Sequence, residues 1–276
     1  VETKAIFMNN ASFSFGGPIP ELYDRYLGPY IFEPYAQDIA ARIKLPVKQV
    51  LEVAAGTGRV THHIAGCIGK DARLTATDIN ADMLAVARQR VNAPHIEWMT
   101  ANAMELPFDD NYFDCVVCQF GYMFLNDRQK GFDEALRVLK PGGQFLFSTW
   151  DKVENNITAY ISRQIVTAFF KDDPPEFYKV PFSMYDPAEL EAHLVAAGFG
   201  NHTVQRVSFM GESESAMHIA TGFVEGNPII NEIVKHDPSQ LEQIKARIAA
   251  QIHSQVSSDP VRSPMNAWVG EGYKKV

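Results

Sequence analysis

The chain of 276 residues has few cysteines, no long apolar run and no excess of positive charge. Three cysteines are too few for a disulfide framework, which fits a reducing compartment and predicts a cytoplasmic protein. Without a run of about 18 apolar residues, no membrane-spanning helix is predicted, and the N-terminus lacks the basic and apolar regions of a secretory leader. The net charge of −8 disfavours nucleic acid or an anionic membrane as partner, because both are bound by clustered lysine and arginine.

Two of the cysteines, Cys115 and Cys118, have a spacing that also occurs in redox and zinc sites. They lie in the segment 113–120, whose apolar pattern predicts a buried strand. Because side chains alternate along a strand, positions three apart point to opposite faces of a sheet. We therefore expect two core thiols and no metal site.

What the chain does contain is a strand, a glycine loop and a helix start between residues 50 and 61. Gly56 and Gly58 let the backbone turn sharply and approach a ligand closely. A dinucleotide-binding loop needs a third glycine where this chain has Thr61, which disfavours a nicotinamide cofactor. Glu52 would repel a pyrophosphate, but it would suit a ligand that carries an ammonium and a sulfonium group.

The next predicted strand, 73–78, ends in Asp78, twenty residues after Gly58. An acid at this place can accept hydrogen bonds from both hydroxyls of a ribose. A plain helix cap is the other interpretation of such an aspartate. Asn80 is predicted to cap the following helix, which turns Met83 inward.

Further along, a strand at 95–99 precedes a turn through Asn102 and Ala103, and Leu-Lys-Pro-Gly-Gly at 139–143 precedes a strand at 144–150. In this order, the motifs between residues 47 and 150 resemble those of class I S-adenosylmethionine-dependent methyltransferases, in particular the ubiquinone/menaquinone (type 11) branch. The resemblance implies S-adenosylmethionine as cofactor and S-adenosylhomocysteine as its product. It also implies a Rossmann-like methyltransferase fold, an α/β, doubly wound, seven-stranded and mainly parallel sheet with an antiparallel final strand.

The resemblance further implies which residues bind the cofactor. Asn102 stands where the family has an aspartate that accepts from the adenine amino group, and the Ala103 N–H would meet an adenine ring nitrogen. Ala54 replaces the first glycine of the loop motif, which is tolerable if its φ angle is negative. The expected cofactor-binding residues are Glu52, Ala54, Gly56, Gly58, Asp78, Ile79, Met83, Asn102, Ala103, Gln119 and Tyr23.

Four regions are expected: an N-terminal helical lid (1–46), the methyltransferase core (47–210), an inserted helical cap (211–262) and a final strand of the core sheet (263–276). Prolines should divide the aromatic lid into short helices, because proline is tolerated only at helix starts. Tyr23 is the lid residue expected over the cofactor. The cap includes a helix that starts with a capping box at 239–242, and it is either a wall of the substrate pocket or a homodimer interface.

The implied reaction is methyl transfer to a small-molecule acceptor, mainly by proximity and alignment. An aromatic-rich lid and cap suggest a partly apolar acceptor. Candidates for a base are Tyr122, Tyr160, Tyr178 and His193, but the pattern assigns a catalytic role to none of them. A nicotinamide-dependent oxidoreductase and a non-catalytic S-adenosylmethionine-binding partner module remain as alternatives.

Overall fold

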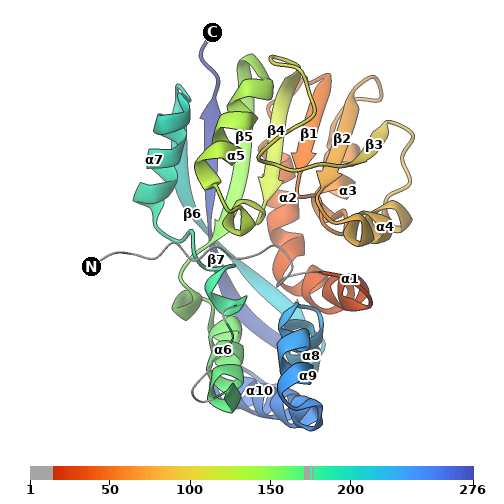
Figure 1. Cartoon of the computed structure of the whole chain (residues 1–276), viewed down its shortest axis with the longest axis vertical. Helices are drawn as coiled ribbons and strands as arrows, with labels where there is room; N and C mark the ends of the chain where they lie inside the picture. Colours follow the sequence, from red (N-terminus) through yellow and green to blue (C-terminus); the bar gives the residue numbers. More distant parts are fainter. Residues whose placement is uncertain (1–14, 171–174, 176) are drawn as a thin grey trace.

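The computed structural model describes residues 15–170, 175 and 177–276, and residues 1–14 of the predicted lid lie outside the described residues. Within the described residues, seven strands form one sheet in the order β3-β2-β1-β4-β5-β7-β6. All neighbouring strands are parallel except β7, which is antiparallel to both β5 and β6. The predicted doubly wound, mainly parallel sheet is therefore confirmed (Figure 1).

The strands of this sheet are β1 (Gln49–Val53), β2 (Arg73–Asp78), β3 (Ile96–Thr100), β4 (Phe113–Gln119), β5 (Leu139–Trp150), β6 (His202–Ser213) and β7 (Val261–Tyr273). The α-helices are α1 (Ile19–Leu22), α2 (Glu33–Ala41), α3 (Arg59–Cys67), α4 (Ala81–Arg90), α5 (Arg128–Val138), α6 (Ile157–Phe170), α7 (Pro187–Ala197), α8 (Ala216–Glu225), α9 (Ile229–His236) and α10 (Leu241–Gln255). None of the helices in the described part of the chain has the length and apolar character needed to span a bilayer.

Helices cover both faces of the sheet, and the two strand cysteines show how the faces divide. Cys115 packs with apolar residues of α2 and α3, whereas Cys118 belongs to the cluster that contains α5 and α7. Both thiols are buried, and burial raises the pKa of Cys118 to about 12. The prediction of core thiols on opposite faces is confirmed, and the described residues contain no cluster that could hold a metal ion.

The lid region differs from its prediction. Between α1 and α2 the chain forms a π-helix, Tyr23–Phe32, and Pro29 lies inside it instead of at a helix start. Pro29 leaves one backbone carbonyl of this segment without its helical donor, and π-helical turns are frequent at functional sites. The prolines therefore do not divide the segment into separate helices, because one continuous helical segment runs from Ile19 to Ala41.

Two other local predictions also need correction. β5 begins at Leu139 instead of residue 144. Gly142 has a positive φ of 79°, and the register between β4 and β5 shifts in this part of the strand. The predicted Pro-Gly turn is therefore a bulge inside β5. No side chain caps α10. Asp237 instead caps the short 3₁₀ turn Pro238–Gln240, which precedes that helix.

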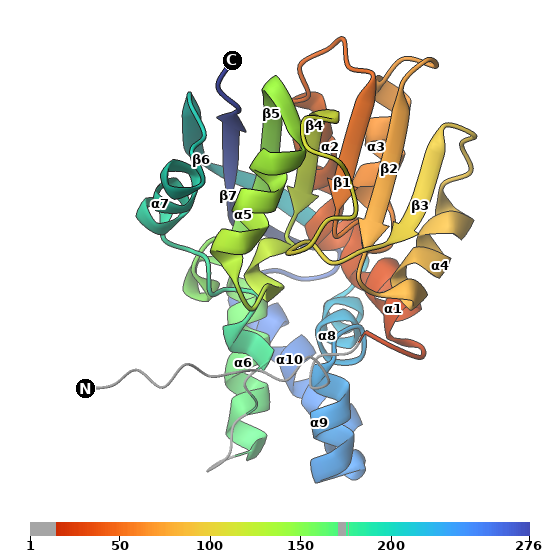
Figure 2. The same cartoon turned by 45° about the horizontal axis from the view of Figure 1, so that its top comes forward.

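A second group of helices lies beyond the carboxyl ends of the parallel strands (Figure 2). β6 runs to Ser213 and β7 begins at Val261, so α8, α9 and α10 are inserted between these two long strands. α6, which follows β5, packs against both α8 and α10 and joins the same group. We call α6, α8, α9 and α10 the helical cap. Its position places it opposite the edge of the sheet where ligands of open α/β folds bind.

Candidate active site

The loop after β1 has the backbone conformation that its glycines predict. Gly56 and Gly58 have φ angles of 57° and 80°, in the left-handed region that favours glycine. A Cβ atom on Gly58 would lie 3.0 Å from the Cβ of Ala87 on α4, so this position also needs glycine for close packing. The loop is thus held tightly between β1 and α4.

Ala54 does not have the negative φ that would make it an easy substitute for glycine. Its φ is 55°, a value that costs a non-glycine residue roughly 1–2 kcal/mol. The methyl group is accommodated because residue 121 is glycine: a Cβ there would come within 2.6 Å of the Ala54 Cβ. The condition for an easy substitution, a negative φ, is therefore not met, and the loop stores strain at this residue.

Asp78 is fixed at the end of β2. One carboxylate oxygen accepts from the Gly56 N–H and the other from the Asn80 N–H, both at 2.8 Å. The side chain is buried, and burial raises its pKa. Of the neighbouring predicted residues, Met83 is buried on α4, while Ile79 is 63% exposed and offers an apolar surface to a ligand. This turn is thus the start of α4, and the acceptor role of Asp78 toward a ligand stays a prediction.

Between the glycine loop and the lid lies a pocket of about 350 Å³, open on one side. It contains buried polar atoms that lack a hydrogen-bond partner in the described residues: Glu52 Oε2, Gln119 Oε1 and Arg59 Nε. Burial raises the pKa of Glu52 to about 8. Burying a polar atom without a partner is unfavourable, so three such atoms around one pocket indicate a site built for a polar ligand.

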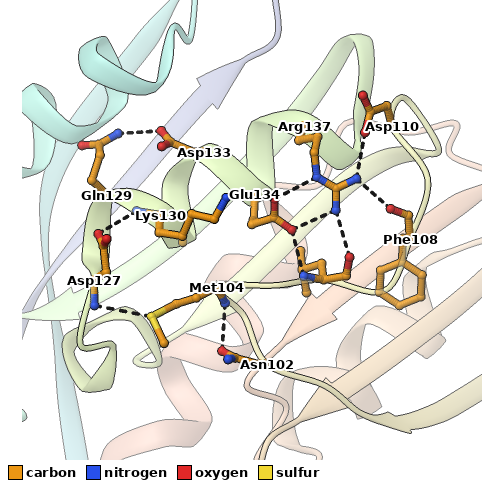
Figure 3. A network of polar contacts seen from close by, with 12 residues as sticks. Asn102, Met104, Phe108, Asp110, Asp127, Gln129, Lys130, Asp133, Glu134 and Arg137 are labelled. Atoms are coloured by element: carbon orange, nitrogen blue, oxygen red, sulfur yellow. Dashed lines mark hydrogen bonds and ion pairs between the residues drawn. The ribbon is translucent and has the colours of Figure 1, made fainter.

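β3 ends at Thr100, the register partner of Asp78 on β2, so the turn through Asn102 and Ala103 begins at the same edge of the sheet. Figure 3 shows Asn102 and Met104 of this turn. The Asn102 Oδ1 accepts from the Met104 N–H at 3.0 Å, which closes the turn. An aspartate would offer a ligand a second carboxylate oxygen, whereas the other atom of this amide is a donor. The Asn102 Oδ1 keeps one lone pair beyond its bond to Met104, so its acceptor function stays a prediction.

Tyr23 and Phe32, both on the lid, separate the polar pocket from a larger apolar one. Their rings stack with centroids 4.8 Å apart, and both residues line both pockets. Burial raises the pKa of Tyr23, and the nearby Asp78 charge adds to the shift. Tyr26, the other lid tyrosine near this position, contacts His218 on α8 and lines neither pocket.

The apolar pocket has a volume of about 710 Å³ including its open mouth, and it lies between the lid, the strand ends and the helical cap. Phe120 and Trp150, at the ends of β4 and β5, stack face to face with centroids 3.8 Å apart and form part of its wall. No charged side chain lines it among the described residues. The remaining lining residues include Leu27, Ile31, Phe124, Ala159, Phe177, Tyr178, Phe182, Phe223, Asn227 and Met265.

The lid is fastened to the glycine loop by charged groups. Asp24 accepts from the Thr57 hydroxyl at 2.8 Å and pairs with Arg59 at 3.2 Å and with Arg90 of α4. Arg59 also donates to the Asp24 carbonyl at 2.7 Å and to Glu33 at 2.8 Å. We call the contacts of Asp24 with Thr57, Arg59 and Arg90 the clasp. These residues follow Asp24 by 33 positions or more, so no local sequence pattern predicts the contacts.

Only one of the four tyrosine and histidine candidates for a base lies at the site. Tyr178 lines the apolar pocket. Its hydroxyl hydrogen-bonds the Ser162 hydroxyl at 2.7 Å, and burial raises its pKa. Tyr122 is buried and bonds the Gly131 carbonyl, Tyr160 lines neither pocket, and His193 bonds Gln129 and stacks on Phe132. The catalytic assignment therefore stays open.

The strand order with its reversed β7, the glycine loop after β1 and the acid after β2 together define a Rossmann-like methyltransferase fold. The model of the ubiE/COQ5 methyltransferase family matches residues 35–175, and the chain belongs to this family.

Similar proteins agree with this assignment. The ubiquinone/menaquinone biosynthesis C-methyltransferase UbiE of Brucella abortus is 42% identical over 115 residues, and the match spans 40% of this chain and 43% of that protein, less than half of either. The YcgJ protein from Bacillus subtilis has the same fold, with a TM-score of 0.60 and 16% identity over 88% of this chain and 99% of that one. The phosphoethanolamine N-methyltransferase 2 of Haemonchus contortus, solved with phosphomonomethylethanolamine and S-adenosylhomocysteine, has a TM-score of 0.59 and 16% identity over 93% of this chain and 57% of that one.

Proposed function

We propose that the protein transfers a methyl group from S-adenosylmethionine to a small, partly apolar acceptor. The observation that carries this proposal is the pair of adjoining pockets, one polar at the glycine loop and one apolar under the cap, which share only Tyr23 and Phe32 among their lining residues. A charged cofactor and an apolar acceptor could meet at this wall. Family membership supports the same reaction.

The residues of the polar pocket fit the cofactor. Glu52, whose Oε2 lacks a partner, would pair with the ammonium group, and Gln119 offers an unpaired amide oxygen nearby. Asp78 would accept from the ribose hydroxyls, since each carboxylate oxygen has lone pairs beyond its one backbone hydrogen bond. Ala103 would donate its N–H to the adenine ring. The bound cofactor supplies a methyl group already activated by its sulfonium.

The chain's own contribution to the reaction is to align the acceptor and exclude water. The stacked Phe120 and Trp150 rings give a flat apolar surface for the acceptor, and the clasped lid closes the cofactor side. Tyr178 keeps its proton because its pKa is raised. With no ionisable base in the described pocket lining, the nucleophile of the acceptor would have to lose its own proton to solvent or react uncharged.

The two alternatives receive no support. A nicotinamide cofactor would need a glycine at Thr61, which is fully buried on α3. A non-catalytic S-adenosylmethionine-binding partner module would need the polar pocket, but it would not explain the apolar pocket that adjoins it. Cytoplasmic location and homodimer formation through 211–262 stay predictions, which cell fractionation and light scattering would test.

Thermal unfolding with S-adenosylhomocysteine, with NAD as control, tests the proposal directly. At one hundred times its dissociation constant, a ligand adds about 2.7 kcal/mol of stability, which for a chain of this size raises the midpoint by several degrees. We expect this rise with S-adenosylhomocysteine only, and a smaller one for Asp78→Asn, whose affinity should fall by roughly 1–3 kcal/mol. A rise with NAD alone, or with neither ligand, would overturn the assignment.

A further inference from the structure

The chain between β3 and β4 crosses the adenine side of the proposed cofactor site as a loop. No helix forms in the described residues 101–112. Thr100 is the register partner of Asp78, and the Ala101 N–H donates to the Asp78 carbonyl at 3.1 Å. The loop therefore starts directly beside the carboxylate proposed for the ribose. Without a helix of its own, such a loop needs an external anchor to keep a ligand-binding N–H in place.

An ion pair on α5, between the buried Glu134 and the partly exposed Arg137, provides this anchor (Figure 3). Glu134, only 5% exposed, accepts from the Leu106 N–H at 2.8 Å. Arg137 donates to the Leu106 carbonyl at 2.9 Å and to the Phe108 carbonyl at 2.7 Å. The two side chains also bond each other twice, both times at 2.8 Å. Two charged residues on one helix thus fix three backbone groups of the loop.

The chemistry of this pair is specific to arginine. Besides the four hydrogen bonds given above, Arg137 donates a fifth to Asp110 at 2.8 Å, so each of its five guanidinium N–H groups has an acceptor. The guanidinium holds the pKa of Glu134 below its usual range, so the carboxylate stays ionised. Lysine would keep the charge but could not hold both the carboxylate and two carbonyls in this planar arrangement.

Several backbone N–H groups of the anchored loop have no acceptor among the described residues, and the Ala103 N–H is one of them. It directly follows Asn102, whose Oδ1 accepts from the Met104 N–H. Adenine and hypoxanthine differ at the atom that would face such a donor, because N1 of adenine accepts a hydrogen bond and N1 of hypoxanthine carries a hydrogen. The loop therefore has the means to distinguish them, provided that it is held rigidly.

We propose that Glu134 and Arg137 are positioning residues for purine recognition, which clamp Leu106 and Phe108 so that the Ala103 N–H selects a 6-aminopurine over a 6-oxopurine. This inference rests on the proposed function, since it assumes that the purine of S-adenosylmethionine binds here. Glu134 and Arg137 would act through the loop backbone at Leu106 and Phe108, without contacting the ligand themselves. Their effect must therefore appear as a loss of selectivity as well as a loss of affinity.

Calorimetric titration with two ligands tests the clamp. S-adenosylhomocysteine and its 6-oxo analogue, S-inosylhomocysteine, are titrated into the wild-type chain and into Arg137→Lys and Glu134→Gln. The matched control is Arg128→Lys, which alters an arginine at the start of the same helix that pairs with Glu189 at 3.0 Å and with Ser183. We expect the wild type and the control to prefer S-adenosylhomocysteine by at least tenfold, and both clamp variants to reduce that preference to threefold or less.

The outcomes separate this inference from the proposed function. If S-adenosylhomocysteine does not bind to the wild type, both the proposed function and the clamp are refuted. Wild-type binding with an unchanged preference in the clamp variants, or an equal loss for both ligands, would overturn the clamp alone. If neither variant folds, amide exchange of the wild type decides: the Leu106 N–H should be protected with and without ligand, and the Ala103 N–H only with S-adenosylhomocysteine. An Ala103 N–H that the ligand does not protect would also refute the inference.

Discussion

At the scale of single residues, Ala54 shows how a loop can retain a strained residue. Its φ of 55° favours glycine, and its methyl group fits only because Gly121 faces it. Ala54→Gly should release roughly 1–2 kcal/mol of strain, partly offset by about 0.4–1 kcal/mol from the more flexible unfolded chain. We expect a net gain in the free energy of unfolding of about 0.5–1 kcal/mol in urea denaturation.

The neighbouring residue gives a matched control for this substitution. Ala55 is buried and does not have a positive φ, so Ala55→Gly should lower the free energy of unfolding. If Ala54→Gly destabilised the chain as much as Ala55→Gly, the strain assigned to residue 54 would be refuted.

Glu52 makes stability depend on pH in a definite direction. Burial raises its pKa from 4.5 to about 8, so between these values the folded chain keeps a proton that the unfolded chain has lost. The free energy of unfolding therefore falls as pH rises through this window. Between pH 6 and pH 8 the loss from this group should be about 2 kcal/mol.

Glu52→Gln removes this titration. Urea denaturation of the ligand-free chains at pH 6 and pH 8 should show a smaller decrease for the variant than for the wild type, while titrating groups common to both cancel in the comparison. Equal decreases in the two chains would show that Glu52 ionises in the folded protein near its usual pKa.

At the scale of elements, one lid carboxylate contacts three separate parts of the core. Asp24 bonds Thr57, Arg59 and Arg90, which come from the glycine loop, α3 and α4. Hydrogen bonds to charged groups are worth about 1.5–3 kcal/mol each, so Asp24→Asn should loosen the lid. We expect S-adenosylhomocysteine to dissociate roughly tenfold faster from this variant in surface plasmon resonance, since 1.4 kcal/mol corresponds to a factor of ten.

Asp38→Asn provides the comparison for the lid variant. Asp38 pairs with Arg42 at 2.7 Å within α2 and touches neither the glycine loop nor α4. Its loss should leave the dissociation rate unchanged. If both variants release the ligand at the wild-type rate, the clasp does not control access to the polar pocket.

At the scale of the whole molecule, the sheet and the helical cap enclose a space that neither could form alone. The apolar pocket takes its wall from the lid, from β4 and β5, and from α6 and α8. Since no charged side chain lines it among the described residues, an anion would enter without a partner and lose its hydration. We expect 2-naphthol to bind at least tenfold more tightly than naphthalene-2-sulfonate.

Tryptophan fluorescence can measure this binding, because Trp150 lines the pocket. The binding signal should be absent in the control variant Trp150→Phe. The variant Ala159→Phe fills the pocket from α6, so it should weaken the binding of 2-naphthol but not the binding of S-adenosylhomocysteine. Tighter binding of the sulfonate would show that a cation reaches the pocket and that the acceptor class is misjudged.

The sequence by itself determined the elements whose signals are local. Short runs of aliphatic and β-branched residues predict β1, β2 and β4. Gly56 and Gly58 specify the loop, because conformational limits act on each residue separately. The spacing of Asp78 from that loop placed both at one edge of the sheet, since parallel strands end on the same side. The family followed from the order of these motifs.

Tertiary structure alone decided the features that depend on contacts between distant segments. The positive φ of Ala54, the clasp of Asp24 on Thr57 across 33 residues, and the clamp of Glu134 on Leu106 across 28 arise only when the helices pack. The apolar pocket also exists only once α6 and α8 meet the strand ends. A sequence pattern records which residues share a face of one element, but it does not record which faces of different elements come together.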